Sequence, residues 1–298
     1  MIVGTVAVVG RANAGKSTLV NVLVGEKVSI VSPKPQTTRD RILGVLTTEK
    51  YQIVFADTPG IYKASGALNA FMQRSASLAT EDVDLVLYVA DCHAGVSSED
   101  LNIIKSLSDK TENLVVAMTK IDIMPEKEIP LELVKFSELN VDVVPVSARR
   151  GKNLKELVKV ILSKLPDGDK IFYEDIISDR SERFMIGEIM REKILLKYDK
   201  EIPHGIAVIV AEFAKRDSGN LYDISLDIVC EKPAHKSILI GKQGRAIKEV
   251  SAFARQDMEK FLDAKVFLTT YVKVKENWRE SESLIREYGY NIQDLGAK

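Results

Sequence analysis

Cysteine, histidine and tryptophan are scarce in this sequence, whose 298 residues include 2 cysteines, 3 histidines and 1 tryptophan. Cys92 and Cys230 lie far apart and neither belongs to a Cys-x-x-Cys motif, so we expect reduced thiols and no disulfide. The histidines His93, His204 and His235 are scattered along the chain. This leaves no histidine cluster of the kind that binds a transition metal.

Long apolar runs and an excess of charge of one sign are missing too. The stretch 206–211 is among the longest apolar runs, far short of the ~18 residues that span a bilayer. The first residues show no basic segment and no cleavage site, so we expect a cytoplasmic protein and no secretion. With 42 basic and 43 acidic residues, any nucleic-acid surface must be local. The length and the 45% apolar content predict a soluble protein of about two domains.

The most informative stretch that is present is GRANAGKST, which follows a short apolar run and precedes a segment with helical spacing. In this context Gly-x-x-x-x-Gly-Lys-Ser cradles phosphate with backbone N–H groups and a helix N-terminus. We expect Lys16 to reach the β- and γ-phosphates, Ser17 to bind Mg²⁺, and Gly15 to let the backbone approach the phosphate. All nine residues are nucleotide-binding candidates: Gly10, Arg11, Ala12, Asn13, Ala14, Gly15, Lys16, Ser17 and Thr18.

The next segment, 25–39, is polar and contains prolines, which is typical of an exposed loop. Thr37 and Thr38 lie in it. Either threonine could complete the magnesium shell while a γ-phosphate is present and release it after hydrolysis. The choice between the two stays open.

Asp57-Thr58-Pro59-Gly60 follows a predicted apolar strand, about forty residues after the phosphate cradle. A carboxylate at the end of a buried strand needs a polar partner, and Mg²⁺ is the natural one for Asp57. We expect the N–H of Gly60 to face the γ-phosphate. Thr58 and Pro59 complete this candidate segment.

Gly60 is followed by Ile61, at a place where some nucleotide hydrolases have a glutamine that orients the attacking water. Isoleucine cannot hydrogen-bond water, so we expect slow intrinsic hydrolysis or another way of positioning the water. Two candidates for stabilising the transition state remain open: an arginine of the chain, Arg39 or Arg41, and a potassium ion held partly by Asn13. The candidate catalytic residues are Asn13, Lys16, Thr37, Thr38 and Gly60.

Thr119-Lys120-Ile121-Asp122 follows another predicted strand. The carboxylate of Asp122 can accept hydrogen bonds from N1–H and N2 of guanine, whereas adenine offers no matching donors and would leave Asp122 unpaired. We expect the stem of Lys120 to lie over the base. The N–H groups of Ser147 and Ala148 are candidates for contacting guanine O6. With Thr119, these residues form the predicted base site.

Apolar strands that alternate with amphipathic helices predict a doubly wound, mostly parallel α/β sheet over residues 1–168. Its ligand is expected at the carboxyl ends of the strands, where all the motifs above fall. The expected strands are 6–9, 44–48, 51–56, 84–90, 113–118 and 141–146, and the expected helices are 19–24, 68–79, 99–107 and 154–165.

Residues 169–180 are expected to form a linker, and residues 181–298 a second domain of α+β class without a further phosphate motif. The pattern predicts a hairpin between two helical regions, and then a strand and a last helix. The expected helices are 182–197, 234–240, 245–262 and 278–288, and the expected strands are 205–215, 221–230 and 266–274.

Positive charge is concentrated around Gly241-Lys242-Gln243-Gly244, between two of these helices. Residues 232–248 hold five basic side chains and no acidic one, as expected for an electrostatic contact with nucleic acid. Apolar neighbours such as Ile238 are expected in the core, with Ile240 at the floor of a groove. The candidate RNA-binding residues are Lys232, Lys236, Ile240, Gly241, Lys242, Gln243, Gly244, Arg245 and Lys248.

The motifs GRANAGKS, the threonine pair, DTPG, TKID and SA stand in the order found in translation-factor-class GTPases, which residues 1 to about 168 resemble. One departure is Thr119, because the family usually has an asparagine there that ties the phosphate loop to the base. Residues 181–298 resemble a KH domain of type II topology, whose Gly-x-x-Gly loop clamps about four nucleotides.

A GTPase domain followed directly by one KH domain resembles the Era family of ribosome-assembly GTPases. The resemblance implies a switch that binds GTP and GDP with Mg²⁺, holds the 3′ end of 16S ribosomal RNA and assists assembly of the 30S subunit. It also implies peripheral association with the inner face of the membrane, and we expect a monomer. A second interpretation stays open, an RNA-binding module whose nucleotide site is structural and does not cycle.

Overall fold

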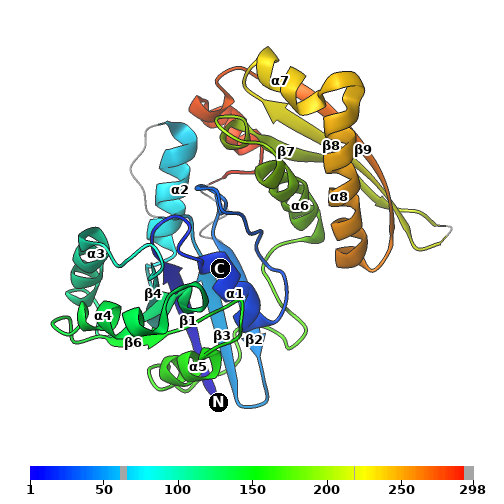
Figure 1. Cartoon of the computed structure of the whole chain (residues 1–298). Coiled ribbons are helices and arrows are strands. Elements are labelled where there is room, and N and C mark those ends of the chain that lie inside the picture. Colours follow the sequence, from blue (N-terminus) through cyan, green and yellow to red (C-terminus); the bar gives the residue numbers. More distant parts are fainter. Residues whose placement is uncertain (61–65, 218, 292–298) are drawn as a thin grey trace.

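The computed structural model describes residues 1–60, 66–217 and 219–291. Within these ranges the chain forms one sheet in the order β2-β3-β1-β4-β5-β6 and a smaller one in the order β7-β8-β9 (Figure 1). We call the first sheet with its helices the six-stranded unit, and the second sheet with its helices the three-stranded unit. None of the described helices is long and apolar enough to cross a membrane.

The six-stranded unit is a mostly parallel, doubly wound sheet, as predicted. The chain starts in the middle of the sheet and adds strands first on one side and then on the other, with only β2 antiparallel to its neighbour. This order places a crevice at the carboxyl end of β1. The strands are β1 (Ile2–Val9), β2 (Ile42–Thr47), β3 (Tyr51–Asp57), β4 (Leu85–Asp91), β5 (Leu114–Thr119) and β6 (Asp142–Pro145).

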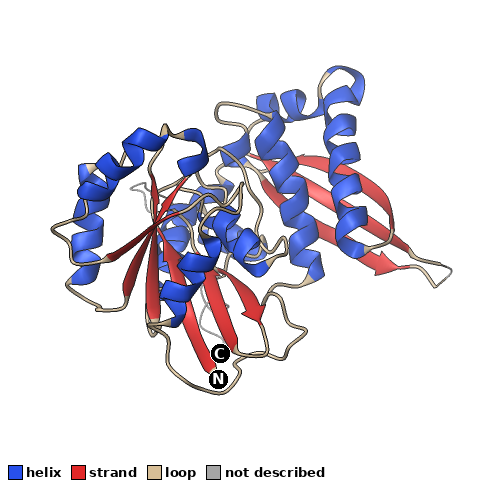
Figure 2. Cartoon of the chain, turned by 60° about the horizontal axis from the view of Figure 1, so that its bottom comes forward, coloured by secondary structure: helices blue, strands red, loops and turns tan. Residues whose placement is uncertain are grey.

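Helices cover both faces of this sheet, which explains why its strands are continuously apolar. Helices α1 (Lys16–Val24) and α5 (Leu154–Leu162) pack into the core on one face. On the other face lie α3 (Ser98–Ser108) and the short helix α4 (Ile129–Val134). Figure 2 shows the two layers on either side of the strands. The sequence pattern did not predict α4, which is too short to show a clear period.

The three-stranded unit has the predicted α+β arrangement. The antiparallel pair β7 (Ala207–Lys215) and β8 (Leu221–Cys230) is joined by β9 (Lys265–Val274), which runs parallel to β8. Helices α6 (Glu182–Lys197), α7 (Pro233–Ile240) and α8 (Arg245–Leu262) share one core with the sheet, on one of its faces.

The prediction of one helix over 278–288 was wrong. The structure has a 3₁₀ turn, η5 (Trp278–Glu280), and a separate short helix, α9 (Glu282–Glu287). Ser281 between them is extended, and its hydroxyl accepts a hydrogen bond from the N–H of Leu284. Serine is a favoured N-cap because it satisfies a free N–H in this way, so it starts a new helix here.

The segment 169–180, predicted as a linker, is bound along the edge of the larger sheet. The side chain of Gln52 accepts from the N–H groups of Ile171 and Phe172 at 2.8 and 2.9 Å. Farther along, the N–H of Val45 in edge strand β2 donates to the carbonyl of Ile177 at 2.8 Å. The segment therefore covers polar groups of a sheet edge that would otherwise be open to pairing.

An apolar cluster joins the two units. Phe71 and its neighbours on α2 (Ala67–Leu78) pack against Trp278 and Ile285 near the C-terminus. Trp278 is fully buried, and its indole N–H donates to the carbonyl of Gly205 at 3.0 Å. Figure 1 shows α2 reaching toward these C-terminal elements, which are drawn in red.

Candidate functional site

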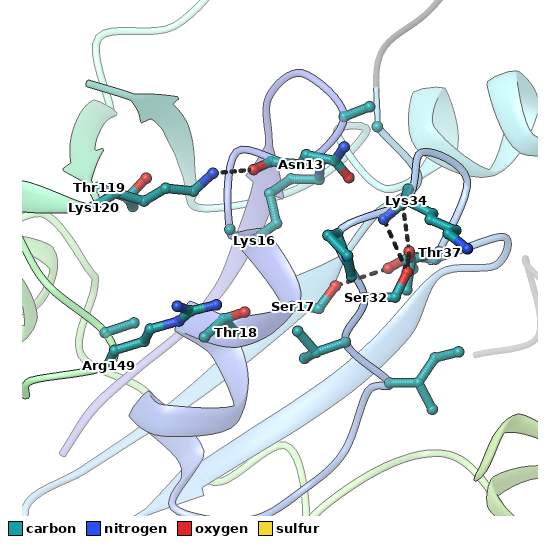
Figure 3. Close-up of a pocket in the computed structure, with 18 of the residues that line it drawn as sticks. Asn13, Lys16, Ser17, Thr18, Ser32, Lys34, Thr37, Thr119, Lys120 and Arg149 are labelled. Atoms are coloured by element: carbon teal, nitrogen blue, oxygen red, sulfur yellow. Dashed lines mark hydrogen bonds between the residues drawn. The ribbon is translucent and has the colours of Figure 1, made fainter. Parts of the chain in front are cut away.

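A cavity of about 550 Å³ lies at the carboxyl ends of the parallel strands, next to the start of α1. Its wall combines the phosphate-cradle residues, the segment 30–38, the residues that follow β5, and one side chain of the three-stranded unit, Leu196. Figure 3 shows Lys16 and Ser17 at the centre, with Lys120 on one side and Thr37 on the other. The cavity thus gathers motifs that are more than 100 positions apart in the sequence.

Glycines shape the phosphate cradle. Gly10 has φ +147°, and a Cβ there would lie 2.4 Å from the carbonyl oxygen of Val89. Gly15, with φ +97°, precedes α1 and provides no side-chain cap. The first N–H groups of α1 therefore have no capping side chain and can bind an anion.

The side chain of Lys16 is buried within this loop. Its Nζ donates to the carbonyls of Gly10 and Arg11 at 3.1 and 3.0 Å. Burial lowers the pKa of Lys16 from its ordinary value of 10.5 to about 8. A phosphate would supply the negative charge that this desolvated ammonium group needs.

Ser17, Thr38 and Asp57 converge, as a magnesium site requires. The hydroxyl oxygens of Ser17 and Thr38 are 2.8 Å apart, and the Thr38 hydroxyl lies 3.4 Å from Oδ2 of Asp57. Asp57 is fully buried, and its Oδ1 has no hydrogen-bond partner among the described residues. Burial raises the pKa of this carboxyl group. Two hydroxyls and a buried carboxylate are oxygen ligands of the kind that Mg²⁺ prefers, so the residues fit the ion.

Thr37 does not join this group. Its hydroxyl lies 2.7 Å from that of Ser32 and donates to the carbonyl of Lys34 at 2.6 Å. In this structure only Thr38 of the pair faces Ser17 and Asp57.

Arg39 does not face the cavity either. The side chain is 2% exposed, and its guanidinium group donates to the carbonyls of His204 and Ile206 at 2.9 and 2.6 Å. The prediction that Arg39 supplies positive charge to the phosphates is therefore wrong for this structure. Arg41, the other arginine candidate, is absent from the cavity lining. The guanidinium of Arg39 instead joins the two units.

The segment after β3 packs against the phosphate cradle. The hydroxyl of Thr58 donates to the carbonyl of Val8 at 2.7 Å, which fixes this segment to β1. Gly60 lines the cavity, and a Cβ on it would lie 2.8 Å from the backbone of Ala12. Only glycine allows this close approach. Pro59 is not part of the lining, and Ile61 lies outside the described residues.

At the other end of the cavity, Asp122 and Lys120 are positioned for a base. The Ser147 hydroxyl donates to Oδ1 of Asp122 at 2.7 Å, and Asp122 is exposed to the cavity. The Nζ of Lys120 bonds the carbonyl of Asn13 at 2.8 Å and the carboxylate of Asp91 at 2.5 Å. Its stem is thus stretched between the base end and the phosphate cradle (Figure 3).

The structure separates the two predicted O6 donors. The N–H of Ser147 donates to the carbonyl of Lys152 at 3.1 Å, so the prediction that it contacts a base was wrong. Ala148 lines the cavity. Ser147 and Lys152 form an isolated β-bridge that closes the turn between them. No sequence pattern predicts this bridge.

Two residues of the phosphate cradle, Arg11 and Asn13, are exposed. The Arg11 side chain points away, toward α3, where it bonds the Ser97 hydroxyl at 3.0 Å, so only its backbone belongs to the site. Asn13 is exposed, lines the cavity and has φ +62°. The idea that Asn13 holds a potassium ion stays a prediction.

The second candidate site is the turn between α7 and α8. Gly241 has φ +70° and Gly244 has φ +74°, with Gln243 also at positive φ. The side chains of Lys242, Gln243, Arg245, Lys248 and Lys232 are exposed, and those of Lys236 and Ile240 are partly buried. Ile238, predicted in the core, is 52% exposed, because the helical turn points it away from the sheet. The exposed surface around this turn therefore includes the apolar side chain of Ile238 in addition to the basic side chains.

Two family models match the chain, "50S ribosome-binding GTPase" over residues 5–120 and "KH domain" over residues 201–279. GTPase Era of Clostridium kluyveri is 43% identical over 289 residues, which cover 96% of this chain and 98% of the relative. GTPase Era of Clostridium botulinum is 44% identical, with 96% and 97% covered.

Two solved structures are similar over nearly the whole chain. One is Era in complex with MgGDPNP and nucleotides 1506–1542 of 16S ribosomal RNA, with a TM-score of 0.93, 39% identity, and 97% and 99% of the two chains covered. The other is a variant of Aquifex aeolicus Era bound to GDP and AlF₄⁻, with a TM-score of 0.92, 39% identity and the same coverage.

Proposed function

Because this chain belongs to the Era family of GTPases, we propose that it is a GTP-hydrolysing switch that binds 16S ribosomal RNA near its 3′ end and assists assembly of the 30S subunit. The observation that carries the nucleotide part is the convergence of Ser17, Thr38 and Asp57 beside the phosphate cradle, with one Asp57 carboxylate oxygen that has no hydrogen-bond partner in the described part of the chain. We assign the GTPase domain to residues 1–168, the linker to 169–180 and the KH domain to 181–298.

The nucleotide site divides into a phosphate end and a base end. Lys16 and the N–H groups at the start of α1 bind the phosphates, and Gly60 approaches them from the opposite wall. Mg²⁺, held by Ser17, Thr38 and Asp57, would supply positive charge to the β- and γ-phosphates. At the base end, Asp122 selects guanine, because its carboxylate accepts two hydrogen bonds that adenine cannot donate.

Hydrolysis resets the switch. The segments around Thr38 and Asp57–Gly60 are held while the γ-phosphate is present and are released when it leaves. We assign RNA binding to the turn at Gly241–Gly244 and its basic neighbours, because two helix ends meet there and the two glycines let the RNA backbone approach closely. We propose that the nucleotide state changes how firmly this turn holds RNA.

The experiment that tests the enzyme is phosphate release from GTP under multiple-turnover conditions, with and without 16S ribosomal RNA. We expect slow turnover that is lost in Lys16→Ala, because the buried ammonium group is removed from the phosphate end. Release of no more than one phosphate per molecule would support the structural, non-cycling nucleotide site. An unchanged rate in Lys16→Ala would contradict the assignment of hydrolysis to this phosphate cradle.

The RNA part is tested separately. Lys242→Glu should weaken RNA binding and lower its salt dependence by about one counterion, while phosphate release without RNA stays as in the unchanged chain. Lys260, exposed at the far end of α8, gives a matched control, since Lys260→Glu makes the same charge change away from the turn. Loss of RNA binding and GTP turnover together in Lys242→Glu would contradict the division of labour.

Potassium dependence is a further part of the proposal. The guanidinium group of Arg39 is bonded to backbone carbonyls of the other unit. The candidate for positive charge near the phosphates is therefore a potassium ion held partly by the exposed side chain of Asn13. Replacing K⁺ by Na⁺ should slow GTP turnover. Equal rates in the two salts would remove this role of Asn13.

We also propose a cytoplasmic monomer that associates peripherally with the inner face of the membrane, which rests on the family resemblance. Vesicle flotation with and without anionic lipid tests the association. The absence of flotation with either vesicle would argue against it.

A further inference from the structure

The segment that carries Thr38 is attached to the three-stranded unit. Four of its side chains or peptide groups bond to helix α6 or to residues just after it. Lys27 and the N–H of Val31 contact Glu192, Lys34 contacts Tyr198 and Asp199, and the carbonyl of Thr37 accepts from Arg191.

Glu192 is a buried carboxylate whose partners come mostly from this segment. The side chain is 5% exposed. Oε1 accepts from the N–H of Val31 at 2.9 Å, and Oε2 from Nζ of Lys27 at 2.6 Å. Lys193 on the same helix lies 3.4 Å away. A buried charge with two donors from the other unit holds that backbone in one place.

Arg191 holds the peptide next to Thr38. Its side chain is 1% exposed and forms a two-pronged ion pair with Glu188, with Nε 2.7 Å from Oε1 and Nη2 2.5 Å from Oε2. The same Nη2 donates to the carbonyl of Thr37. On the other side of Thr38, Arg39 is bonded to the carbonyls of His204 and Ile206.

Both sequence neighbours of Thr38 are therefore fixed to the three-stranded unit, while Thr38 itself faces Ser17 and Asp57. A ligand on a loop contributes to a metal site only to the extent that its backbone is already in place. We propose that Arg191 and Glu192 are positioning residues for Thr38, so that helix α6 of the KH domain completes the magnesium site of the GTPase domain. This inference rests on the proposed function, and it names a route by which RNA and nucleotide sites can influence each other.

The test measures the Mg²⁺ concentration that gives half-maximal GTP hydrolysis by the full chain. We expect Arg191→Met to raise this concentration about tenfold, because the variant loses the charge-assisted hydrogen bond to the Thr37 carbonyl along with the ion pair to Glu188. GDP affinity in EDTA and RNA affinity without nucleotide should stay within about twofold of the unchanged chain. Arg191→Lys, which keeps a donor for the Thr37 carbonyl, should restore most of the Mg²⁺ response.

The matched control is Arg183→Met on the same helix. Arg183 also donates to a backbone carbonyl, that of Val210, but within its own unit. An unchanged Mg²⁺ requirement in Arg191→Met, or an equal rise in Arg183→Met, would overturn the inference.

Glu192→Gln provides a second variant that keeps an acceptor for the N–H of Val31 and removes the ion pair with Lys27. We expect Glu192→Gln to raise the Mg²⁺ requirement less than Arg191→Met does. This variant tests the inference if Arg191→Met does not fold. An unmodified chain that hydrolyses no GTP would overturn the proposed function and this inference with it. Normal hydrolysis with unchanged Mg²⁺ dependence in the folded variants would overturn this inference alone.

Discussion

The hydroxyl of Thr119 joins two parts of the nucleotide site. It lies at the end of β5 and is buried, and its Oγ1 lies 2.7 Å from the carbonyl of Ala14 in the phosphate cradle and 3.1 Å from that of Ala90 at the end of β4. An asparagine at this place would also tie the cradle to the base side. Thr119 therefore keeps a hydrogen bond to the phosphate cradle although its side chain is shorter than that of asparagine.

Thr119→Val should weaken GDP binding on the order of tenfold. The valine has the same shape but cannot donate to the Ala14 carbonyl, and an unpaired buried carbonyl costs about 1–3 kcal/mol. The measurement is the affinity for a fluorescent GDP. Thr119→Ser keeps the hydroxyl and serves as the control, with affinity close to that of the unchanged chain. Equal GDP affinities for the valine and serine variants would show that the hydrogen bond from the Thr119 hydroxyl to the phosphate cradle does not contribute to GDP binding.

Asp122→Asn should shift base preference from guanine toward xanthine. The amide offers a donor where the carboxylate accepted, so GDP loses a hydrogen bond and XDP gains one. We expect GDP affinity to fall about 10- to 100-fold, the equivalent of about 1–3 kcal/mol, and XDP affinity to rise. Competition between GDP, ADP and XDP measures this. Unaltered selectivity would place the base elsewhere than at Asp122.

At the scale of elements, the turn between α7 and α8 depends on its two glycines to different degrees. Gly241 combines φ +70° with ψ 179°, and a Cβ on it would lie 2.6 Å from the Cβ of Ala246. Gly244 has φ +74° and ψ 9°, a left-handed conformation with open space around it. The first conformation is essentially restricted to glycine, whereas the second is tolerated by other residues at a cost.

Gly241→Ala should therefore weaken RNA binding more than Gly244→Ala. We expect a loss of about tenfold for the first, corresponding to about 1–3 kcal/mol of strain, and a loss within about threefold for the second. RNA titrations at fixed salt measure both, and GTP turnover without RNA should be unchanged in each. A larger effect at Gly244 would mean that close approach of RNA, and not backbone strain, decides the requirement for glycine.

Elements with a strong period were predictable from the sequence, and those whose form depends on distant contacts were not. The helix α8 and the strand β8 begin and end where the pattern placed them, because each has a regular apolar face or bounding turns. The break at Ser281 was missed, because apolar spacing continues across it while the serine hydroxyl caps a new helix. The edge position of 169–180 depends on Gln52, more than 100 residues away.

The site follows the same division. The residues of the phosphate cradle, Asp57 and Asp122 are found by local motifs, and the structure gathers them around one cavity or its edge. The choice of Thr38 over Thr37, and the engagement of Arg39 by His204 and Ile206, depend on the other unit. A motif specifies which residue types are present, but it carries no information on which neighbour a loop side chain faces.

At the scale of the whole molecule, the two units share a buried core and several buried charges. Phe71 of α2 is 1% exposed, and its ring centre lies 5.7 Å from that of Tyr290. Trp278 in the same cluster is fully buried, and the guanidinium of Arg39 lies over it at 5.9 Å. The helix α2 follows the candidate γ-phosphate segment, so this cluster links that region to the C-terminal elements.

Phe71→Ala should separate the unfolding of the two units. A buried Phe→Ala change costs about 3–5 kcal/mol, and here the loss falls on the contact between units. In differential scanning calorimetry, we expect the unchanged chain to unfold in one transition because its units are coupled. For Phe71→Ala we expect a broadened or split transition whose first midpoint is lower. Phe267→Ala is the matched control, because Phe267 is 59% exposed on β9 and should change stability by only about 0.5 kcal/mol. If both variants gave the same transition as the unchanged chain, the cluster would contribute no coupling, and communication between the nucleotide and RNA sites would depend on the polar contacts of segment 27–39 with helix α6 and the residues that follow it.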